Sequence, residues 1–213
     1  MSDDVATDQG RDGRAEIRRR RVALAGHGGD TTLARRGLAD PDPGVRAAAL
    51  GALARLGTLT AADVEGALAD GLPAVRRRGV EVALAARGRG ARSSLPRAVA
   101  DALGDPDPLV VVNAAWFLAE RRAQAAVPLL VATATGHDDA RCREAAVAAL
   151  GALGEPGGLP AVLGALEDTP SVRRRATVAL AGFDDPRVTP ALRAAAEDRD
   201  WQVRQAAGEL LDE

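Results

Sequence analysis

The chain has 213 residues, a formal net charge of −2 and a pI near 5.8, a balance that argues against a general nucleic-acid binder, since such proteins usually carry a basic excess. Aromatic residues make up only 2% of the chain, so its interior must be built from Ala, Leu and Val, which favours packed helices over a β-sandwich or barrel. The sequence contains neither a run of 18 apolar residues nor an apolar leader segment, and this predicts a cytoplasmic protein without a membrane span.

The first 29 residues divide into a polar part and a basic part. Residues 1–13 are rich in Asp and have no apolar face, which predicts a disordered tail. From Arg14 a basic helical segment runs through Ile17 and Leu24 to a glycine-rich break at residues 26–29. We expect this segment to be a half-repeat that caps the helices that follow.

The rest of the chain repeats a short polar turn, a Val-Arg pair and an Ala/Leu-rich stretch about every 31 residues. The six copies are anchored at Val45, Val75, Val110, Cys142, Val172 and Val203. A period in this range indicates stacked helix pairs that share one elongated core. The first helix of a pair often opens with Pro, and the second follows a turn that carries its own cap, which is the Asp in Asp42-Pro43 and in Asp107-Pro108. In the second helix, the anchor and the residues four and eight positions later lie on one face, which predicts that this face is buried.

The widest spacing between anchors, 35 residues, separates the second and third copies. Residues 87–94 (RGRGARSS) account for it and predict an inserted loop.

An acid stands six residues before the anchor Arg in most copies. These pairs are Asp40–Arg46, Asp70–Arg76, Glu167–Arg173 and Asp198–Arg204. His137 takes the place of the acid before Arg143, and Val111 takes the place of the Arg after Asp105. We predict that these acids and arginines pair, within or between repeats, and so fix how neighbouring repeats stack.

These residues carry a resemblance to a known family. The segment LADPDPGVRAAALGAL at 38–53 and its copies resemble HEAT repeats, and more narrowly the short HEAT-like repeats of phycobilisome bilin lyases. The resemblance spans roughly residues 30–213. It implies an all-α, armadillo-like fold, a right-handed superhelix of about six helix pairs plus the N-terminal half-repeat, so that a single solenoid covers residues 14–213. Most relatives with this fold serve as scaffolds for other proteins.

Catalytic and metal-binding patterns lack support in the sequence. His137, Asp138, Asp139 and Cys142 are the one cluster with ligand chemistry, but Asp139 stands at a helix-cap position and Cys142 at a buried anchor. HEAT-like metal enzymes use His-Glu pairs, and this chain has none. No G-x-S-x-G or P-loop pattern occurs either. We therefore expect no catalytic residues, no metal and no cofactor.

The third copy departs from the others because it places Trp116 and Phe117 in the second helix, six and seven residues after its anchor. In a solenoid, these positions lean toward the concave surface. The partner-binding residues predicted on that surface are Arg78, Glu81, Asn113, Trp116, Phe117, Glu120 and Arg175. An aromatic side chain flanked by Arg is typical of a binding hot spot. The alternative is that Trp116 fills space beside its small Ala neighbours; Trp201 is expected to cover a turn.

Arginine runs are the remaining signal. Residues 14–36 carry seven Arg against Glu16 and Asp30. This segment is either a solvated cap face or a site for an acidic partner or a phosphate backbone.

The sequence thus favours a non-enzymatic scaffold or adaptor that binds another protein or peptide, as a monomer or within a hetero-complex. Two alternatives from other classes stay open: a DNA glycosylase for alkylated bases, and a lyase or chaperone subunit for a tetrapyrrole group. The net negative charge speaks against the first, and the repeat subtype is the reason for the second.

Overall fold

The computed structural model describes residues 3–86 and 94–212, with side chains from Gly13 onward. The described part is helical and contains no β-strand. It divides into two compact units, unit 1 (Met1–Ala98) and unit 2 (Val99–Glu213), with the boundary inside α6 (Ser94–Asp101). The inserted loop predicted at 87–94 lies, apart from Ser94, outside the described residues. One continuous solenoid over residues 14–213 stays a prediction.

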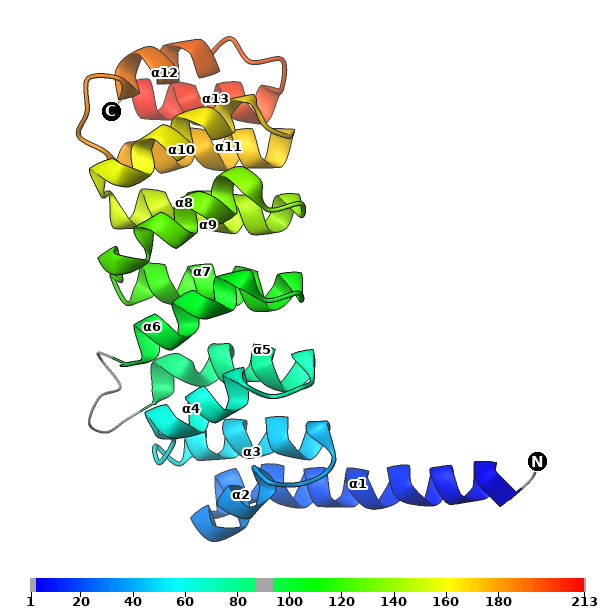
Figure 1. Cartoon of the computed structure of the whole chain (residues 1–213). Coiled ribbons are helices and arrows are strands. Elements are labelled where there is room, and N and C mark those ends of the chain that lie inside the picture. The colour runs from blue at the N-terminus through cyan, green and yellow to red at the C-terminus, as the bar shows by residue number, and fades with distance from the viewer. Residues whose placement is uncertain (1–2, 87–93, 213) are drawn as a thin grey trace. The chain divides into compact units, whose positions relative to one another are not determined.

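Unit 1 stacks helices α1, α3 and α5 side by side (Figure 1). Its elements are α1 (Asp3–Gly28), α2 (Thr31–Gly37), α3 (Pro43–Arg55), α4 (Ala61–Leu68), α5 (Pro73–Val82) and the 3₁₀ turn η1 (Ala83–Ala85). The basic part of α1 packs on α3 through Val22, which contacts Val45 and Ala49, as expected of a capping half-repeat. The helix begins at Asp3, inside the segment predicted to be a disordered tail.

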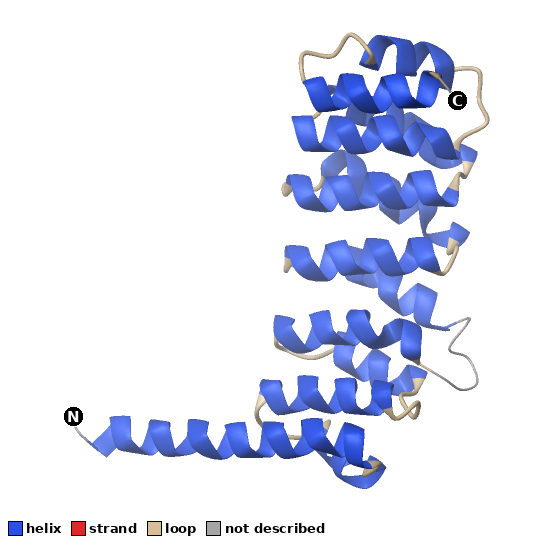
Figure 2. Cartoon of the chain, turned by 180° about the vertical axis from the view of Figure 1, so that it is seen from behind, coloured by secondary structure: helices blue, strands red, loops and turns tan. Residues whose placement is uncertain are grey.

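Unit 2 contains two layers of helices, seen from opposite sides in Figures 1 and 2. The second helices of its pairs, α7 (Pro108–Glu120), α9 (Ala140–Leu153), α11 (Pro170–Ala179) and α13 (Trp201–Leu211), pack on one another in sequence. The first helices are α8 (Val127–Gly136), α10 (Leu159–Gly164) and α12 (Val188–Ala195). The connecting 3₁₀ turns are η2 (Ala102–Gly104), η3 (Gln124–Ala126), η4 (Pro156–Gly158), η5 (Ala165–Glu167) and η6 (Leu180–Gly182).

The repeat pattern accounts for these helices. All six anchors, Val45, Val75, Val110, Cys142, Val172 and Val203, are buried. The second helices α3, α7, α9 and α13 begin behind an Asp that caps them: Asp42, for example, accepts a hydrogen bond from the Val45 N–H at 3.0 Å. In α5 and α11 this position is held by Leu72 and Thr169, whose side chains make no cap hydrogen bond. Gly154 ends α9 with a φ of 66°, a left-handed conformation that favours glycine. None of the described helices is long and apolar enough to cross a bilayer.

Close backbone approach makes glycine necessary where α9 meets η6. A Cβ on Gly151 would lie 2.7 Å from the Ala179 Cα, and a Cβ on Gly182 would overlap the Gly151 carbonyl oxygen. We expect Gly182→Ala to lower the free energy of unfolding of unit 2 by about 2 kcal/mol, because the two repeats must separate to admit the methyl group. The measurement is urea unfolding followed by circular dichroism.

Gly164→Ala in α10 is the matched control. No atom lies within 4 Å of the position that its Cβ would take, and the residue is exposed. Since Ala favours a helix over Gly by about 1 kcal/mol, this change should be neutral or stabilising. Equal losses in the two variants would contradict the close-approach argument.

Candidate functional site

Aspartates in the turns between paired helices organise the stack in both units. The Asp40 Oδ1 accepts the Asp42 N–H at 2.9 Å, the Asp70 Oδ1 accepts the Leu72 N–H at 3.0 Å, and the Asp198 Oδ1 accepts the Asp200 N–H at 2.7 Å. Each turn aspartate thereby folds its own turn. Both carboxylate oxygens keep lone pairs with which they can accept hydrogen bonds from a neighbour.

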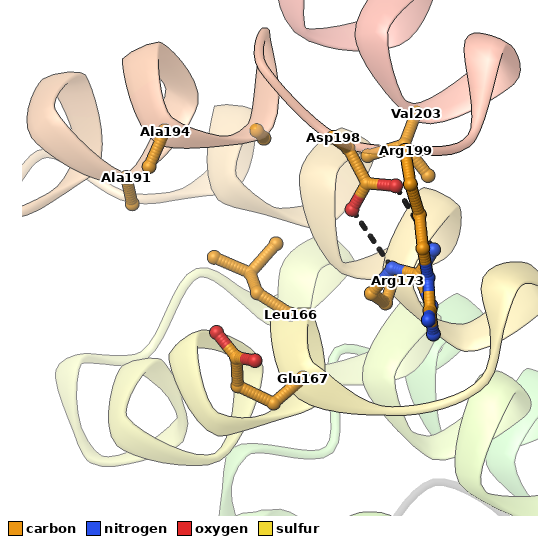
Figure 3. A pocket seen from close by; sticks show the side chains of 9 residues that line it. Leu166, Glu167, Arg173, Ala191, Ala194, Asp198, Arg199 and Val203 are labelled. Carbon is orange, nitrogen blue, oxygen red and sulfur yellow. Dashed lines mark hydrogen bonds and ion pairs between the residues drawn. The ribbon is translucent and has the colours of Figure 1, made fainter.

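An arginine from the preceding second helix binds each of these carboxylates with two hydrogen bonds. We call such a pair a rung; the rungs are Arg18–Asp40, Arg46–Asp70, Arg143–Asp168 and Arg173–Asp198, with nitrogen–oxygen distances of 2.7 to 3.0 Å. The first two lie in unit 1 and the last two in unit 2. Figure 3 shows the Arg173–Asp198 rung beside a pocket of about 400 Å³ between α12 and η5. Planar two-bond pairing of this kind fixes orientation as well as distance.

The arginine side chain also binds back to its own turn. The Arg46 Nη1 donates to the carbonyl oxygens of Asp40 and Pro41 at 2.8 and 3.1 Å. The aspartate six residues before an arginine therefore supplies a backbone carbonyl, and its carboxylate serves the arginine of the preceding repeat. Of the two pairings left open by the sequence, the structure selects the one between repeats.

Charge pairing shifts the pKa values of the rung carboxylates. The pKa of Asp40, Asp70, Asp168 and Asp198 is lowered, primarily by the hydrogen bonds from the arginine side chains and against the opposing effect of burial. The partner arginines have raised pKa values for the same reason. All eight groups are therefore ionised at neutral pH.

Two rung assignments from the sequence need correction. Asp168, and not Glu167, carries the carboxylate that binds Arg143, and its carbonyl accepts the Arg173 Nη1 at 2.9 Å. Arg18 also belongs to the series, although no turn precedes it, because α1 runs on without a break. The sequence rule missed Arg18 because it required an acid in a turn six residues earlier.

One rung of unit 2 lacks both charges. Val111 replaces the arginine and is fully buried, and His137 stands where the partner aspartate is expected. The His137 Nδ1 accepts the Asp139 N–H at 3.0 Å, so the imidazole folds the turn as the aspartates do elsewhere. Because the arginine and the aspartate are both replaced, neither is left as an unpaired charge at this position.

Trp116 stands out on the face that the second helices of unit 2 present to solvent. Its side chain is 50% exposed, while its neighbours Ala115 and Phe117 are fully buried. Val178 occupies the corresponding position of α11 and is 47% exposed. Glu120 is exposed and Asn113 is half-buried on the same helix as Trp116.

Phe117 is the one predicted contact residue that the structure contradicts. Its ring lies in the core of unit 2, and the Arg121 guanidinium lies 5.3 Å from the ring centroid. The corresponding residues of other copies, Ala52, Ala149 and Ala179, are also buried. Position seven after the anchor faces the core, so Phe117 is a packing residue.

The predicted arginines are engaged within their own units. In unit 1, Arg78 pairs with Glu81 at 2.9 Å and lies against Gly51, where it fills the space that a side chain would take. In unit 2, the Arg175 Nη2 lies 3.4 Å from the Glu144 Oε1. These pairs are partly exposed and contribute little stability, so their groups are open to exchange with a partner.

A hollow of about 260 Å³ lies between α11 and α13 on the same face of unit 2, and the sequence reading missed it. Arg174, Val178, Gln202, Gln205 and Glu209 are among its lining residues. The sequence held one signal for this hollow: Arg174, the second arginine of the Arg173–Arg175 run, takes no part in a rung.

The cluster around His137 offers no ligand set in the structure. Asp139 caps α9 by accepting the Arg141 N–H at 2.8 Å, and Cys142 is buried with its Sγ 3.5 Å from the Pro108 carbonyl oxygen. Among the described residues, no three His, Cys, Asp or Glu side chains come together as a metal site would require.

Burial raises the pKa of the Cys142 thiol to about 11. We expect a maleimide reagent at pH 8 to leave this thiol unmodified in the folded protein and to label it fully in guanidinium chloride, because only the exposed thiolate reacts. Intact mass spectrometry measures the labelled fraction. Rapid labelling of the folded chain would contradict the buried position of Cys142.

Comparisons with known proteins agree with this architecture. The family model of HEAT repeats matches residues 96–181 and 165–213. The chain belongs to the HEAT-repeat family. The predicted fold class, an all-α, HEAT-like and armadillo-like solenoid, is thereby confirmed. A comparison with curated proteins gives no match.

Several solved structures share the HEAT-like fold of this chain. The structure of the CpcE–CpcF complex of phycocyanin lyase from Nostoc sp. PCC7120 matches with 25% identity and a TM-score of 0.58, over 83% of this chain and 74% of that chain. YibA of Escherichia coli matches with 19% identity and a TM-score of 0.60, over 81% and 66%. A designed armadillo repeat protein in complex with the peptide (KR)4 matches with 18% identity and a TM-score of 0.60, over 83% and 96%. The last two likenesses concern the fold alone.

Proposed function

We propose that this HEAT-repeat protein is a non-enzymatic scaffold or adaptor, and that it binds another protein or peptide on the second-helix face of unit 2. The observation that carries the proposal is the half-exposed indole of Trp116, set between fully buried neighbours on α7. Aromatic side chains held in this way supply much of the binding energy at protein interfaces, because little entropy is lost when they are covered.

The surface around Trp116 has the composition of an interface. Val178 continues the apolar surface two helices away, roughly 16–20 Å at usual helix spacings, with the half-buried Ala148 of α9 between them. Asn113, Glu120 and the Glu144–Arg175 pair add polar groups on the same face. This distance fits an extended peptide or a helix laid across the second helices. Arg78 and Glu81 of α5 are proposed as contact residues of unit 1.

We expect Trp116→Ala to weaken binding of a captured partner about 30-fold, the value of a central aromatic hot spot worth about 2 kcal/mol. The immobilised wild-type chain and the variant would each capture proteins from native lysate, and partners would be identified by mass spectrometry. Titration of the purified partner then gives the affinity ratio.

Leu129→Ala is the matched control for this experiment. Leu129 is 45% exposed but lies on α8, in the layer of first helices. Partners that are lost with Trp116→Ala and kept with Leu129→Ala support the proposed face. Equal capture by all three proteins would place the binding surface elsewhere.

A second candidate function rests on the likeness to the phycocyanin lyase complex: a subunit that helps to handle a tetrapyrrole group. Cys142 is not an attachment point in this case, because its thiol is buried. Mixing the purified chain with a bilin and recording its visible absorption is the test, and an unaltered bilin spectrum would dismiss this candidate.

A further inference from the structure

Arg174 is a half-buried arginine whose side chain has no hydrogen-bond acceptor in the described part of the chain. It lies on α11, two residues after the anchor Val172, and lines the hollow between α11 and α13. No hydrogen bond or ion pair with another described residue engages its guanidinium. The arginines on either side are occupied, since Arg173 forms a rung and Arg175 pairs with Glu144. A guanidinium carries five N–H donors, so the hollow contains an unused set of them.

The neighbouring pair of helices shows what Arg174 lacks. Glu144 of α9, two positions after its anchor, pairs with Arg175 of α11, three positions after its anchor. Between α11 and α13, the same two positions hold Arg174 and Ala206, and both residues line the hollow. The methyl group of Ala206 thus stands where an acid would complete the pair. The hollow is the space that this acid would take.

The hollow lies on a face that stays accessible inside a stack of repeats. The residues of α13 that line it include those two, three and six positions after the anchor. In α11, the residues at these three positions all reach solvent, although α9 and α13 pack on either side of this helix; they are Arg174, Arg175 and Val178. Access to the hollow therefore does not depend on α13 having a neighbour on one side only.

The other charges of this face favour a carboxylate as the ligand of Arg174. Glu209 also lines the hollow, but its Oε1 accepts the Gln205 Nε2 at 2.9 Å, and no ion pair joins it to Arg174 among the described residues. A phosphate with two negative charges would be repelled by this carboxylate, and a nucleic-acid backbone by Glu120 and Glu144 as well. A carboxylate carries less charge and binds a guanidinium through two hydrogen bonds.

We infer that the partner of the second-helix face carries an aspartate or glutamate whose carboxylate enters the hollow and binds the Arg174 guanidinium. Val178 lines the same hollow, so this acid lies beside the partner residue that covers Val178. The inference rests on the proposed function, because it gives the chemistry of the segment laid across Val178 and Trp116. Trp116 supplies binding energy in this arrangement, and Arg174 selects an acidic segment.

Selection from a random peptide library tests the inference. Displayed peptides of about 12 residues span roughly 40 Å when extended, which is enough to reach from Trp116 to the hollow. The library would be selected on the immobilised wild-type chain and on Trp116→Ala, Arg174→Gln, Arg174→Glu and Arg193→Gln. Arg193 is the matched control, because it is an exposed arginine of the same unit that lies on α12, in the layer of first helices.

The residue preferred at one peptide position is the first readout. We expect peptides selected on the wild type and on Arg193→Gln to share an Asp or Glu at this position. Peptides selected on Arg174→Gln should lack the preference, and those selected on Arg174→Glu should prefer Lys or Arg instead, since the charge in the hollow is reversed.

Titration of a selected peptide gives the size of the contact. Replacing its acid by the matching amide should weaken binding to the wild type about tenfold, and Arg174→Gln should weaken binding of the acidic peptide to a similar extent. The two changes together should cost little more than either alone, because each removes the same pair. Fluorescence anisotropy of the labelled peptide measures the affinities, and circular dichroism checks that the variants are folded.

The outcomes distinguish this inference from the proposed function. Peptides that need Trp116 but share no acid, or whose acid has the same effect in Arg174→Gln, would overturn the inference and leave the proposed face in place. Peptides that need Arg174 and bind Trp116→Ala as tightly as the wild type would support the acid-binding hollow and refute the central role of Trp116. If the wild type selects no peptide, both the proposed function and the inference are wrong.

Discussion

Replacing Asp198 by Asn is expected to lower the free energy of unfolding of unit 2 by about 3 kcal/mol. The Arg173 side chain is only 4% exposed and Asp198 only 15%, so the variant leaves a guanidinium charge with little water and without the carboxylate that binds it. The variant also loosens the contact between repeats, because this rung joins α11 to the turn before α13. Urea unfolding followed by circular dichroism measures the loss.

Asp185→Asn is a closely matched control. The Asp185 Oδ1 accepts the Arg187 N–H at 2.9 Å, and both carboxylate oxygens bind the Arg187 guanidinium, so the local bonds are those of a rung. The Arg187 side chain, however, is 55% exposed, and both residues belong to one turn. We expect a loss below about 1 kcal/mol. Equal losses for Asp185→Asn and Asp198→Asn would refute the idea that burial and the link between repeats give the rung its strength.

Changing both members of the rung separates the charge effect from the packing effect. Arg173→Met with Asp198→Asn should recover part of the loss seen with Asp198→Asn alone, since the uncompensated charge is then absent. A double variant as unstable as the sum of the two single variants would show that the pair has no mutual dependence.

The period of the sequence was sufficient to predict the second helices and their buried face. Val45, Val110 and Val172 lie in separate repeats, yet all three are fully buried, because equal spacing along a helix stack gives equal surroundings. A local pattern repeated six times outweighs the uncertainty of any single copy. The residue types of the rungs were predictable for the same reason.

The partner within each rung was not predictable, because two acids satisfy the pattern. Arg46 has Asp40 six residues before it and Asp70 in the next turn, and the first is closer in sequence. A short, tight turn presents the backbone carbonyl of Asp40 to its own arginine, so the carboxylate of the following turn is the one within reach. Which carboxylate binds the arginine therefore depends on how neighbouring repeats pack, and the spacing of residues within one repeat carries no information about that packing.

At the candidate site, too, a single copy of the repeat was not enough to predict which of two adjacent residues is exposed. Trp116 and Phe117 are adjacent, but one side chain is half-exposed and the other is in the core. A comparison of the copies distinguishes them: position seven after the anchor is apolar in Ala52, Val82 and Ala149, whereas position six varies from Gly51 to Glu81. Repeats therefore tell which way a side chain points, but they do not tell what binds there.

Acid is expected to unfold the protein through the rungs. The pKa of Asp40, Asp70, Asp168 and Asp198 is lower in the folded chain than the unfolded value near 3.9. A group with a lowered folded pKa contributes its full stability above the unfolded value, and this contribution is lost as pH falls through the folded pKa. Stability set by the rungs should therefore be constant from about pH 5 to 7 and fall below about pH 4.

The size of the decrease follows from the number of rungs in a unit. Two rung carboxylates in each unit take up two protons on unfolding, which gives a slope of at most about 2.7 kcal/mol per pH unit. The half-buried Asp139 and Asp185, with pKa values lowered to about 2 by Arg141 and Arg187, add to the decrease in unit 2. Urea midpoints measured by circular dichroism between pH 2.5 and 7 give the profile, and Asp198→Asn should reduce the slope of unit 2, since Asn takes up no proton. A urea midpoint that is the same at pH 3 and at pH 6 would mean that the rung carboxylates have similar pKa values in the folded and unfolded chain, and that the arginines beside them do not hold the repeats together.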